Sequence, residues 1–365
     1  MDDLRRRSGR PVRGPLRHRR SVAVRRRLRR CGGARRECRG LGRRGWLLRW
    51  GVVRRRGWLR WGRGLWRLRR VRRMNVMTST VPRHVTALGP LGLGWRREIA
   101  GVIADLRPGF CEVIAESVPI RRGRAVPDPL LVDLRERGVP LIPHGVALSL
   151  GGVDELEPDR VHRLASCAEA FRAPLVSEHI AFVRAGGIEA GHLLPVPRTR
   201  EAMDVLVRNI RRMQDALTVP FAVENIAAFL RWPDEEFTEA EFLTELMDRT
   251  DALLVLDVAN VYANSLNRGR DPHAELARLP VDRIAYSHVA GGSEGGGRYH
   301  DTHTDPVNSG VLALVTALRE RADVPFMLER DGRYPPAGEL FDELDAIAAA
   351  AGSAPITEAA RRVWT

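Results

Sequence analysis

The sequence contains no lysine in 365 residues and only four cysteines. Cys31, Cys38, Cys111 and Cys167 are too few and too scattered for a disulfide scaffold or a zinc site built from thiolates. No run of 18 or more apolar residues occurs, so we expect no membrane-spanning helix. Together these absences make a reduced cytoplasmic setting the expected one.

The positive charge of the chain lies almost entirely at one end. Residues 1–73 contain 29 arginines and three acidic residues, whereas residues 74–365 contain 31 arginines and 42 acidic residues. The formal net charge of +15 therefore does not describe a basic folded domain. For residues 74–365 a nucleic-acid-binding function is not indicated.

Residues 1–73 repeat Arg, Gly, Trp and Leu without a helical or strand period, so we expect no independent fold there. Arg, Gly, Ala and Pro are encoded by GC-rich codons and lysine is not, which favours a coding start at Met74 or Met77. A disordered arm that binds nucleic acid and an organellar transit peptide are the alternatives. We expect one domain over residues 74–365.

Eight short apolar runs alternate with amphipathic stretches from residue 88 onward. The runs are Leu91–Trp95, Phe110–Glu116, Pro140–Ser149, Pro174–Phe182, Phe221–Ala227, Ala252–Tyr262, Arg283–Gly291 and Pro325–Asp331. Helical periodicity is expected over residues 96–107, 128–136, 155–172, 199–217, 238–249, 272–279, 308–322 and 337–351. This alternation predicts an α/β fold, a parallel (β/α)8 TIM barrel. A doubly wound open sheet is the alternative, but no glycine-rich phosphate loop follows the first run.

Acidic and imidazole side chains gather in the C-terminal halves of these runs, where the strands of a barrel meet at one mouth. The candidates are His144, His179, Glu224, Asp257, Asn260, His288 and Glu329, with Asp301 and His303 in the loop after the seventh run. Burying several carboxylates together is unfavourable unless cations neutralise them. Mixed carboxylates and imidazoles suit iron, zinc or manganese, and so many ligands imply two or three ions. Glu224, central in the order, is the natural bridging carboxylate. Glu116 and Asp331 are the expected acceptors for the imidazoles that bind metal.

Eight motifs that contain these residues occur in a fixed order. They are His144-Gly-Val-Ala-Leu-Ser149, Ser177-Glu-His179, Leu193-Leu-Pro-Val-Pro-Arg-Thr199, Glu224-Asn225, Asp257-Val-Ala-Asn-Val-Tyr262, His288-Val-Ala-Gly291, Asp301-Thr-His303 and Leu328-Glu-Arg-Asp331. Over about residues 89–350 the chain thereby resembles the multinuclear non-haem iron-dependent oxidative enzymes, the family of the methanobactin-biosynthesis oxidase.

This resemblance implies a TIM barrel of the xylose-isomerase-like type that holds two or three iron ions in mixed Fe(II)/Fe(III) states. It also implies O2 as a co-substrate and a ribosomally made precursor peptide as substrate, often modified at cysteine. A partner protein commonly presents the peptide. The implied chemistry is abstraction of a hydrogen from the carbon next to the substrate sulfur.

The resemblance also implies a role for each candidate residue. One ion would be held by His144, His179 and Glu224. A second would be held by Glu224, Asp257, His288 and Glu329. A third would have Asn260, Asp301 and His303 around it. The residues implied in catalysis are Glu224, Asp257, Asn260 and His303.

Four positions differ from the pattern of the family. They are Ser117, Ala259, Gly292 and Thr304, where the family tends to have asparagine, asparagine, histidine and aspartate. The expected ligands are retained, so the resemblance still implies metal binding, whereas it does not specify the substrate or the product.

Three other functions fit parts of the pattern. Zinc-dependent apurinic endonucleases use the same barrel, but they have histidine where this chain has Asn260, and they need a basic surface for phosphates. Sugar isomerases of this barrel type typically rely on a catalytic lysine, which the chain lacks. A non-catalytic metal- or peptide-binding module is the third alternative.

Overall fold

The computed structural model describes residues 88–364, and the interpretations of residues 1–73 lie outside that range. Eight parallel strands close into a barrel in the order β1-β14-β11-β10-β9-β6-β5-β2. Their bounds are β1 Leu91–Trp95, β2 Cys111–Ile114, β5 Leu141–Gly145, β6 Val176–His179, β9 Phe221–Glu224, β10 Leu253–Asp257, β11 Ile284–Val289 and β14 Phe326–Leu328. The expected (β/α)8 barrel is confirmed.

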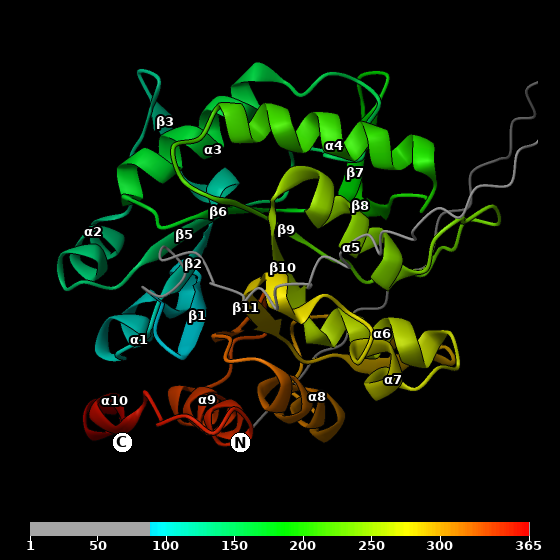
Figure 1. Cartoon of the computed structure of the whole chain (residues 1–365). Coiled ribbons are helices and arrows are strands. Elements are labelled where there is room, and N and C mark those ends of the chain that lie inside the picture. Colours follow the sequence, from blue (N-terminus) through cyan, green and yellow to red (C-terminus); the bar gives the residue numbers. More distant parts are fainter. Residues whose placement is uncertain (1–87, 365) are drawn as a thin grey trace, which may run out of the picture. The chain divides into compact units, whose positions relative to one another are not determined.

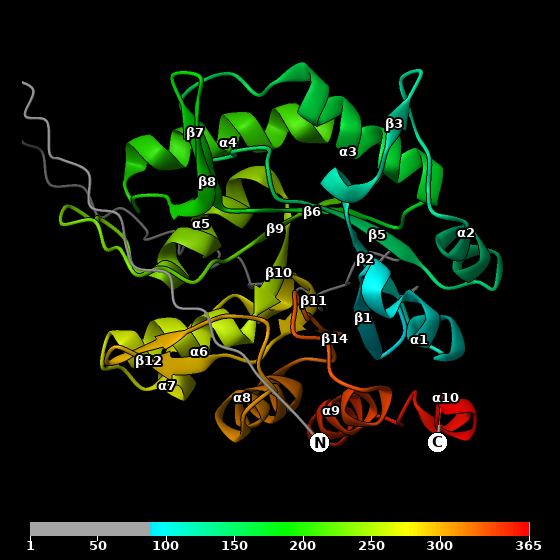
Figure 2. The ribbon, with the colours of Figure 1, turned by 180° about the vertical axis from the view of Figure 1, so that it is seen from behind.

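The helices lie around the outside of the strands, as both views show (Figures 1 and 2). The α-helices are α1 Ala100–Asp105, α2 Pro129–Glu136, α3 Pro158–Phe171, α4 Arg200–Asp215, α5 Glu239–Thr250, α6 Val258–Asn267, α7 Pro272–Leu276, α8 Ser309–Arg321, α9 Ala337–Ala350 and α10 Glu358–Trp364. Short 3-10 helices cover Arg97–Ile99, Ala115–Ser117 and Val281–Arg283. Three antiparallel hairpins extend the loops: β3 Ile120–Arg121 with β4 Arg124–Ala125, β7 Ala181–Ala185 with β8 Ile188–Pro195, and β12 Ser293–Gly295 with β13 Arg298–His300.

The interior of the barrel begins with an apolar layer. Phe110, Ile142, Leu175, Val255 and Tyr286 belong to one buried cluster, and the rings of Phe110 and Tyr286 meet at 5.4 Å although their strands are not neighbours. Side chains alternate between the two faces of a strand, so the residue two positions further along also faces inward. Those residues are Glu112, His144, Ser177, Asp257 and His288. The polar layer of the interior therefore lies directly on the apolar one.

Two of the expected elements have different bounds in the structure. The run Ala252–Tyr262 is not one strand, because β10 ends at Asp257 and α6 begins at Val258. The carboxylate of Asp257 accepts a hydrogen bond from the backbone N–H of Asn260 at 2.8 Å, which caps the new helix. The expected helix over residues 96–107 is a 3-10 turn followed by only six α-helical residues.

The two described thiols are buried, and one helix begins with a complete capping box. Cys111 and Cys167 are free and buried, and burial raises the pKa of each thiol to about 12. The capping box of Thr238 and Glu241 is present at the start of α5. Within residues 88–364 no helix has both the length and the apolar character needed to cross a membrane, and a cytoplasmic location stays a prediction.

Candidate metal centre

The structure brings all nine candidate residues to the same end of the barrel. His144 and His288 lie in β5 and β11, while His179, Glu224 and Asp257 are the last residues of β6, β9 and β10. Glu329 follows β14, Asn260 lies in the first turn of α6, and Asp301 and His303 lie in the loop after β13. Possible ligand atoms within 4.8 Å of one another form three overlapping groups: His144, His179 and Glu224; Glu224, Asp257, His288 and Glu329; Asp257, Asp301 and His303.

Glu224 faces the first two groups with different oxygen atoms. Its Oε2 lies 3.5 Å from His144 Nε2 and 3.7 Å from His179 Nε2. Its Oε1 lies 3.3 Å from His288 Nδ1, which is also 3.1 Å from Glu329 Oε2. A carboxylate with one oxygen in each of two groups has the geometry of a bridging ligand.

The third group combines a helix start with a loop. Asp257 Oδ2 lies 4.0 Å from His303 Nε2, which also contacts Asp301 Oδ2 at 2.7 Å. The side-chain nitrogen of Asn260 donates to the carbonyl of Asn225 at 3.0 Å, which leaves its Oδ1 for another partner. His303 has a φ of +54°, a left-handed backbone conformation that is uncommon for residues other than glycine.

The unpaired atoms at these positions are the ones that a cation would need. Among the described residues, the buried side-chain atoms without a hydrogen-bond partner include Glu224 Oε2, Asp257 Oδ2, Asn260 Oδ1, His288 Nδ1 and Asp301 Oδ1. Orphaned buried polar atoms are rare in proteins and costly. Oxygen and imidazole nitrogen donors of this kind suit divalent iron, manganese or zinc, so the residues fit a multinuclear metal centre.

Strong mutual interactions perturb the acids and imidazoles of the groups. Burial acts against the charged form of Glu224 and Glu329, but the facing imidazoles hold the pKa of both carboxyls below the usual range. Burial beside Asp301 raises the pKa of Asp257 well above its usual value. Burial disfavours the imidazolium of His179, yet Glu224 and Glu178 raise its pKa to about 9.

The metal-free protein should lose stability as the pH rises from about 6.5 to 9. The raised pKa of His179 means that its imidazolium stabilises the fold fully below the unfolded pKa near 6.5 and no longer above about 9. The expected loss is on the order of 1–3 kcal/mol. Thermal unfolding of protein freed of metal by a chelator, at both pH values, measures this loss of stability. The His179→Gln variant should show a weaker dependence of stability on pH. Equal stability of the wild-type protein at both pH values would contradict this assignment.

Each buried imidazole has a partner for the nitrogen that faces away from the groups. His144 Nδ1 contacts Ser177 Oγ at 2.8 Å, His179 Nδ1 contacts the carbonyl of Gly145 at 3.1 Å, and His288 Nε2 contacts Glu112 at 2.8 Å. Such contacts fix the orientation of ligand imidazoles in metal sites.

Glu112 was missed by the sequence analysis, which chose Glu116 and Asp331 as partners for imidazoles. Asp331 Oδ2 does lie 3.4 Å from His303 Nδ1, but Glu116 accepts a hydrogen bond from the backbone of Val146 instead. Burial would raise the pKa of Glu112, but His144 and His288 lower it to about 2. The sequence could have identified Glu112, since it is the one charged residue of the segment Phe110–Ile114. It is also two positions after Phe110, so it faces the same side of the strand.

Arg96 lies at the mouth beside a further group of possible ligands, His303, Glu329 and Asp331. Its guanidinium donates to Glu329 Oε1 at 3.2 Å and to Asp331 Oδ1. The positive charge of Arg96 offsets part of the negative charge of these two acids, so no separate ion is assigned to this group. Arg96 also lines a cavity of about 580 Å³ together with Trp95, Ile114 and Val118, which places an open space next to the mouth.

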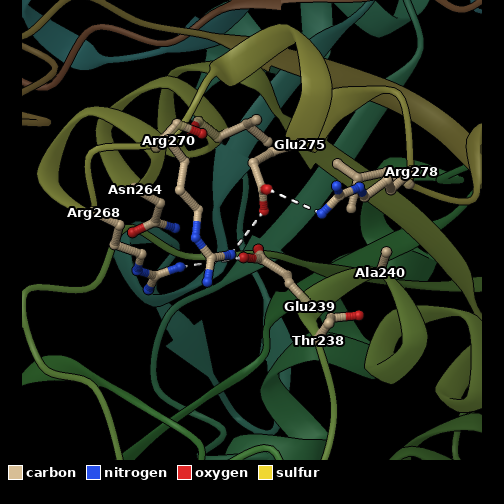
Figure 3. A pocket seen from close by; sticks show the side chains of 11 residues that line it. Thr238, Glu239, Ala240, Asn264, Arg268, Arg270, Glu275 and Arg278 are labelled. Atoms are coloured by element: carbon tan, nitrogen blue, oxygen red, sulfur yellow. Dashed lines mark hydrogen bonds and ion pairs between the residues drawn. The ribbon is translucent and has the colours of Figure 1, made fainter.

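Another hollow, shown in Figure 3, lies away from the metal-binding groups between α5, α6 and α7. Its volume is only about 20 Å³. Glu275 pairs with Arg270 at 3.1 Å and with Arg278 at 3.4 Å, while Glu239 pairs with Arg268 at 3.6 Å. The charges therefore satisfy one another, and the hollow offers no unpaired group to a substrate.

Gly292, one of the positions that differ from the family pattern, lies against the β12–β13 hairpin. A Cβ at this position would lie 2.3 Å from the carbonyl oxygen of His300 and 2.7 Å from the ring of Tyr299. We expect Gly292→Ala to destabilise the fold by about 1–3 kcal/mol, because the backbone must move. The matched control is Gly295→Ala, whose Cβ would meet only the His300 ring at 3.6 Å. Thermal unfolding compares the melting temperatures of the two variants. Equal melting temperatures would show that the β12–β13 hairpin accommodates the added methyl group without cost.

Comparisons with known sequences identify relatives. Residues 90–352 match the family model described as RiPP precursor modification enzyme MbnB/TglH/ChrH. A UPF0276 protein of Streptomyces avermitilis is 51% identical over 276 residues, which cover 72% of this chain and 56% of that protein. A UPF0276 protein of Caulobacter vibrioides is 39% identical over 237 residues, which cover 65% of this chain and 84% of that protein. The chain thus spans just over half the length of the Streptomyces relative.

A solved structure with the same fold is endonuclease IV from Thermus thermophilus. It aligns with a TM-score of 0.50 and 19% identity, and the match covers 73% of this chain and all of that chain. At this identity the likeness concerns the barrel alone.

Proposed function

This chain belongs to the MbnB/TglH/ChrH family of RiPP precursor modification enzymes, and from that membership we propose that it uses two or three iron ions and O2 to oxidise a precursor peptide, at cysteine. Iron would be held by His144, His179 and Glu224, by Glu224, Asp257, His288 and Glu329, and by Asn260, Asp257, Asp301 and His303. Bound iron would supply the redox chemistry and a position for O2.

The observation that carries the proposal is the two-sided placement of Glu224. One oxygen faces a pair of imidazoles and the other faces His288 in a second group. A zinc site that only stabilises a fold is usually closed by four ligands around one ion. Overlapping groups that share a carboxylate suit ions that act together on one substrate.

The first group has too few protein ligands to fill the coordination sphere of an iron ion, which would leave positions for a substrate. The first group offers three protein ligands, fewer than the four to six donors that iron commonly takes, and His179 is partly exposed whereas His144 is fully buried. A cysteine thiolate is a soft ligand that iron binds well. An ion held by His144, His179 and Glu224 would therefore have coordination positions free for the thiolate of the peptide.

Several residues of this chain would act on the peptide without binding metal. Arg96 and Asp331 lie at the mouth, beside the cavity of about 580 Å³ through which we propose the peptide approaches. On the barrel side, the apolar layer that contains Phe110 and Val255 would separate the ions from water. A partner protein that presents the peptide is part of the proposal.

The test is turnover with a cysteine-bearing precursor peptide. A short open reading frame with cysteine beside the gene identifies the candidate peptide. We expect iron-loaded protein, with its partner protein where the gene neighbourhood supplies one, to consume O2 and to change the mass of this peptide. The same peptide with serine in place of cysteine should remain unchanged. Modification without O2, or with zinc in place of iron, would contradict the proposed chemistry.

The alternatives make different predictions for the same preparation. An apurinic endonuclease would cut DNA at abasic sites without O2, and a sugar isomerase would interconvert ketose and aldose. A non-catalytic module would bind the peptide and leave its mass unchanged. Each alternative has its own assay, and all the assays use the full chain.

A further inference from the structure

Three fully buried side chains underneath the metal-binding groups belong to none of them. They are Glu112 on β2, Ser177 on β6 and Tyr286 on β11. Glu112 and Ser177 lie in the same layer as His144 and His288, whereas the ring of Tyr286 belongs to the apolar layer below. A carboxylate in the interior of a barrel costs free energy unless it is paired. The contacts of Glu112 therefore need an explanation.

Glu112 is the end point of two hydrogen-bonded branches. One is direct, since His288 Nε2 contacts Glu112 Oε2 at 2.8 Å. The other passes through Tyr286, whose hydroxyl contacts Glu112 Oε2 at 2.5 Å and Ser177 Oγ at 2.8 Å. Ser177 Oγ in turn contacts His144 Nδ1 at 2.8 Å. One carboxylate is thus connected to an imidazole of the first group and to one of the second.

The direction of each hydrogen bond follows from which imidazole nitrogen faces the ions. His288 Nδ1 lies among Glu224 and Glu329, so it must be unprotonated to bind a metal, and the proton sits on Nε2. His144 Nε2 faces Glu224 and His179 in the same way, so its proton sits on Nδ1.

With those tautomers every donor has an acceptor. His144 donates to Ser177, the hydroxyl of Ser177 donates to Tyr286, and the hydroxyl of Tyr286 donates to Glu112. His288 donates to the same carboxylate oxygen. An ionised carboxylate accepts hydrogen bonds and donates none, so Glu112 can terminate both branches at its Oε2 atom.

We propose that Glu112 is a positioning residue that sets the tautomer of His288 directly and that of His144 through Tyr286 and Ser177, and so prepares two adjacent ion sites together. This inference rests on the proposed metal centre. Outer partners of this kind typically change metal affinity by about 10- to 100-fold when they are removed.

The test is a titration of the full-length, metal-free protein with Co(II) alone, followed by visible absorption and by metal analysis. Glu112→Gln keeps the size of the side chain and removes its charge, and we expect about 10- to 100-fold weaker binding at both sites. Tyr286→Phe breaks only the branch to His144, so it should weaken one site and leave the other as in wild type. Ser177→Ala should reproduce the effect of Tyr286→Phe.

Tyr286→Phe and Ser177→Ala each remove a single hydroxyl, so they test the inference even if Glu112→Gln does not fold. Unchanged affinity at both sites in these two variants would overturn it, and so would equal weakening of both sites. Glu239→Gln, an acid outside the metal-binding groups, is the control and should bind Co(II) as wild type does.

The inference and the proposed function fail in different ways. Variants that bind Co(II) normally would refute the role of Glu112 while iron-dependent peptide oxidation still stands. A wild-type protein that binds two ions but leaves the peptide unchanged would refute the proposed function and leave the role of Glu112 intact.

Discussion

Replacing Glu224 with alanine is expected to remove most of the bound metal. The wild-type protein should carry two to three equivalents of iron, and the variant should retain at most one. The reason is that Glu224 Oε2 serves the group of His144 and His179 while Oε1 serves the group of His288, so one substitution removes a donor from two sites. The affinity of both ions should fall by more than about 100-fold, since loss of a ligand exceeds the effect of losing an outer partner. Metal analysis and Mössbauer spectroscopy of anaerobically reconstituted protein measure the change.

Two controls separate loss of a ligand from general damage. Glu239→Gln changes an acid in the outer hollow of Figure 3 and should leave the iron content at the wild-type value. Glu224→Gln retains one oxygen donor, so it should keep more iron than Glu224→Ala. If Glu224→Ala kept its full metal content and remained folded, the assignment of Glu224 as the bridge would be wrong.

Removing the metal from the wild-type protein is expected to cause the largest change in stability. Without ions, Glu224, Asp257 and Glu329 lie together inside the barrel, and one buried oxygen of Glu224 and one of Asp257 have no hydrogen-bond partner. An ion held at about a thousand times its dissociation constant stabilises the native state by roughly 4 kcal/mol. Two or three such ions should raise the melting temperature by on the order of 10–20 °C in a chain of this size.

Differential scanning calorimetry before and after treatment with a chelator tests this expectation. Restoring Fe(II) should return the original melting temperature, while Mg(II), which prefers oxygen ligands, should restore little of it. The Glu224→Ala variant provides an internal comparison, because its melting temperature should respond only weakly to the chelator. A wild-type melting temperature that chelation leaves unchanged would show that the acids are accommodated without ions.

The barrel fold and the candidate metal ligands could be predicted from the sequence because two simple patterns coincide. Strands that are covered on both faces appear as apolar runs, and polar residues at their C-terminal ends meet at one mouth. Glu224, Asp257 and His179 were found because they lie in the C-terminal halves of predicted runs. The runs extend beyond them, however, and only the structure shows that each is the last residue of its strand.

The start of helix α6 could not be predicted in the same way. Apart from Asn260, the segment Val258–Tyr262 is apolar, because the first turns of α6 are buried. A short apolar run of this kind does not distinguish a buried helix from a buried strand. The hydrogen bond that the backbone N–H of Asn260 donates to the carboxylate of Asp257 marks where the strand ends and the helix begins.

Glu112 and Arg96 depend on contacts that no local pattern contains. Glu112 meets His288 across 176 residues of sequence, and Arg96 meets Asp331 across 235. The sequence analysis chose Glu116 because functional residues tend to lie at the ends of strands. The acid that contacts the imidazole is Glu112, which lies two residues before the end of β2. The pleat and register of the closed barrel, not the sequence spacing, decide which acid reaches the imidazole.

The most direct measurement is anomalous X-ray diffraction at the iron absorption edge from crystals grown under reducing, iron-replete conditions. Peaks are predicted on both sides of the Glu224 carboxylate, one beside His144 and His179 and the other beside His288 and Glu329, with a third beside Asp301 when three ions are bound. A map with no anomalous peak at these positions, and with the carboxylates turned toward solvent, would contradict the account.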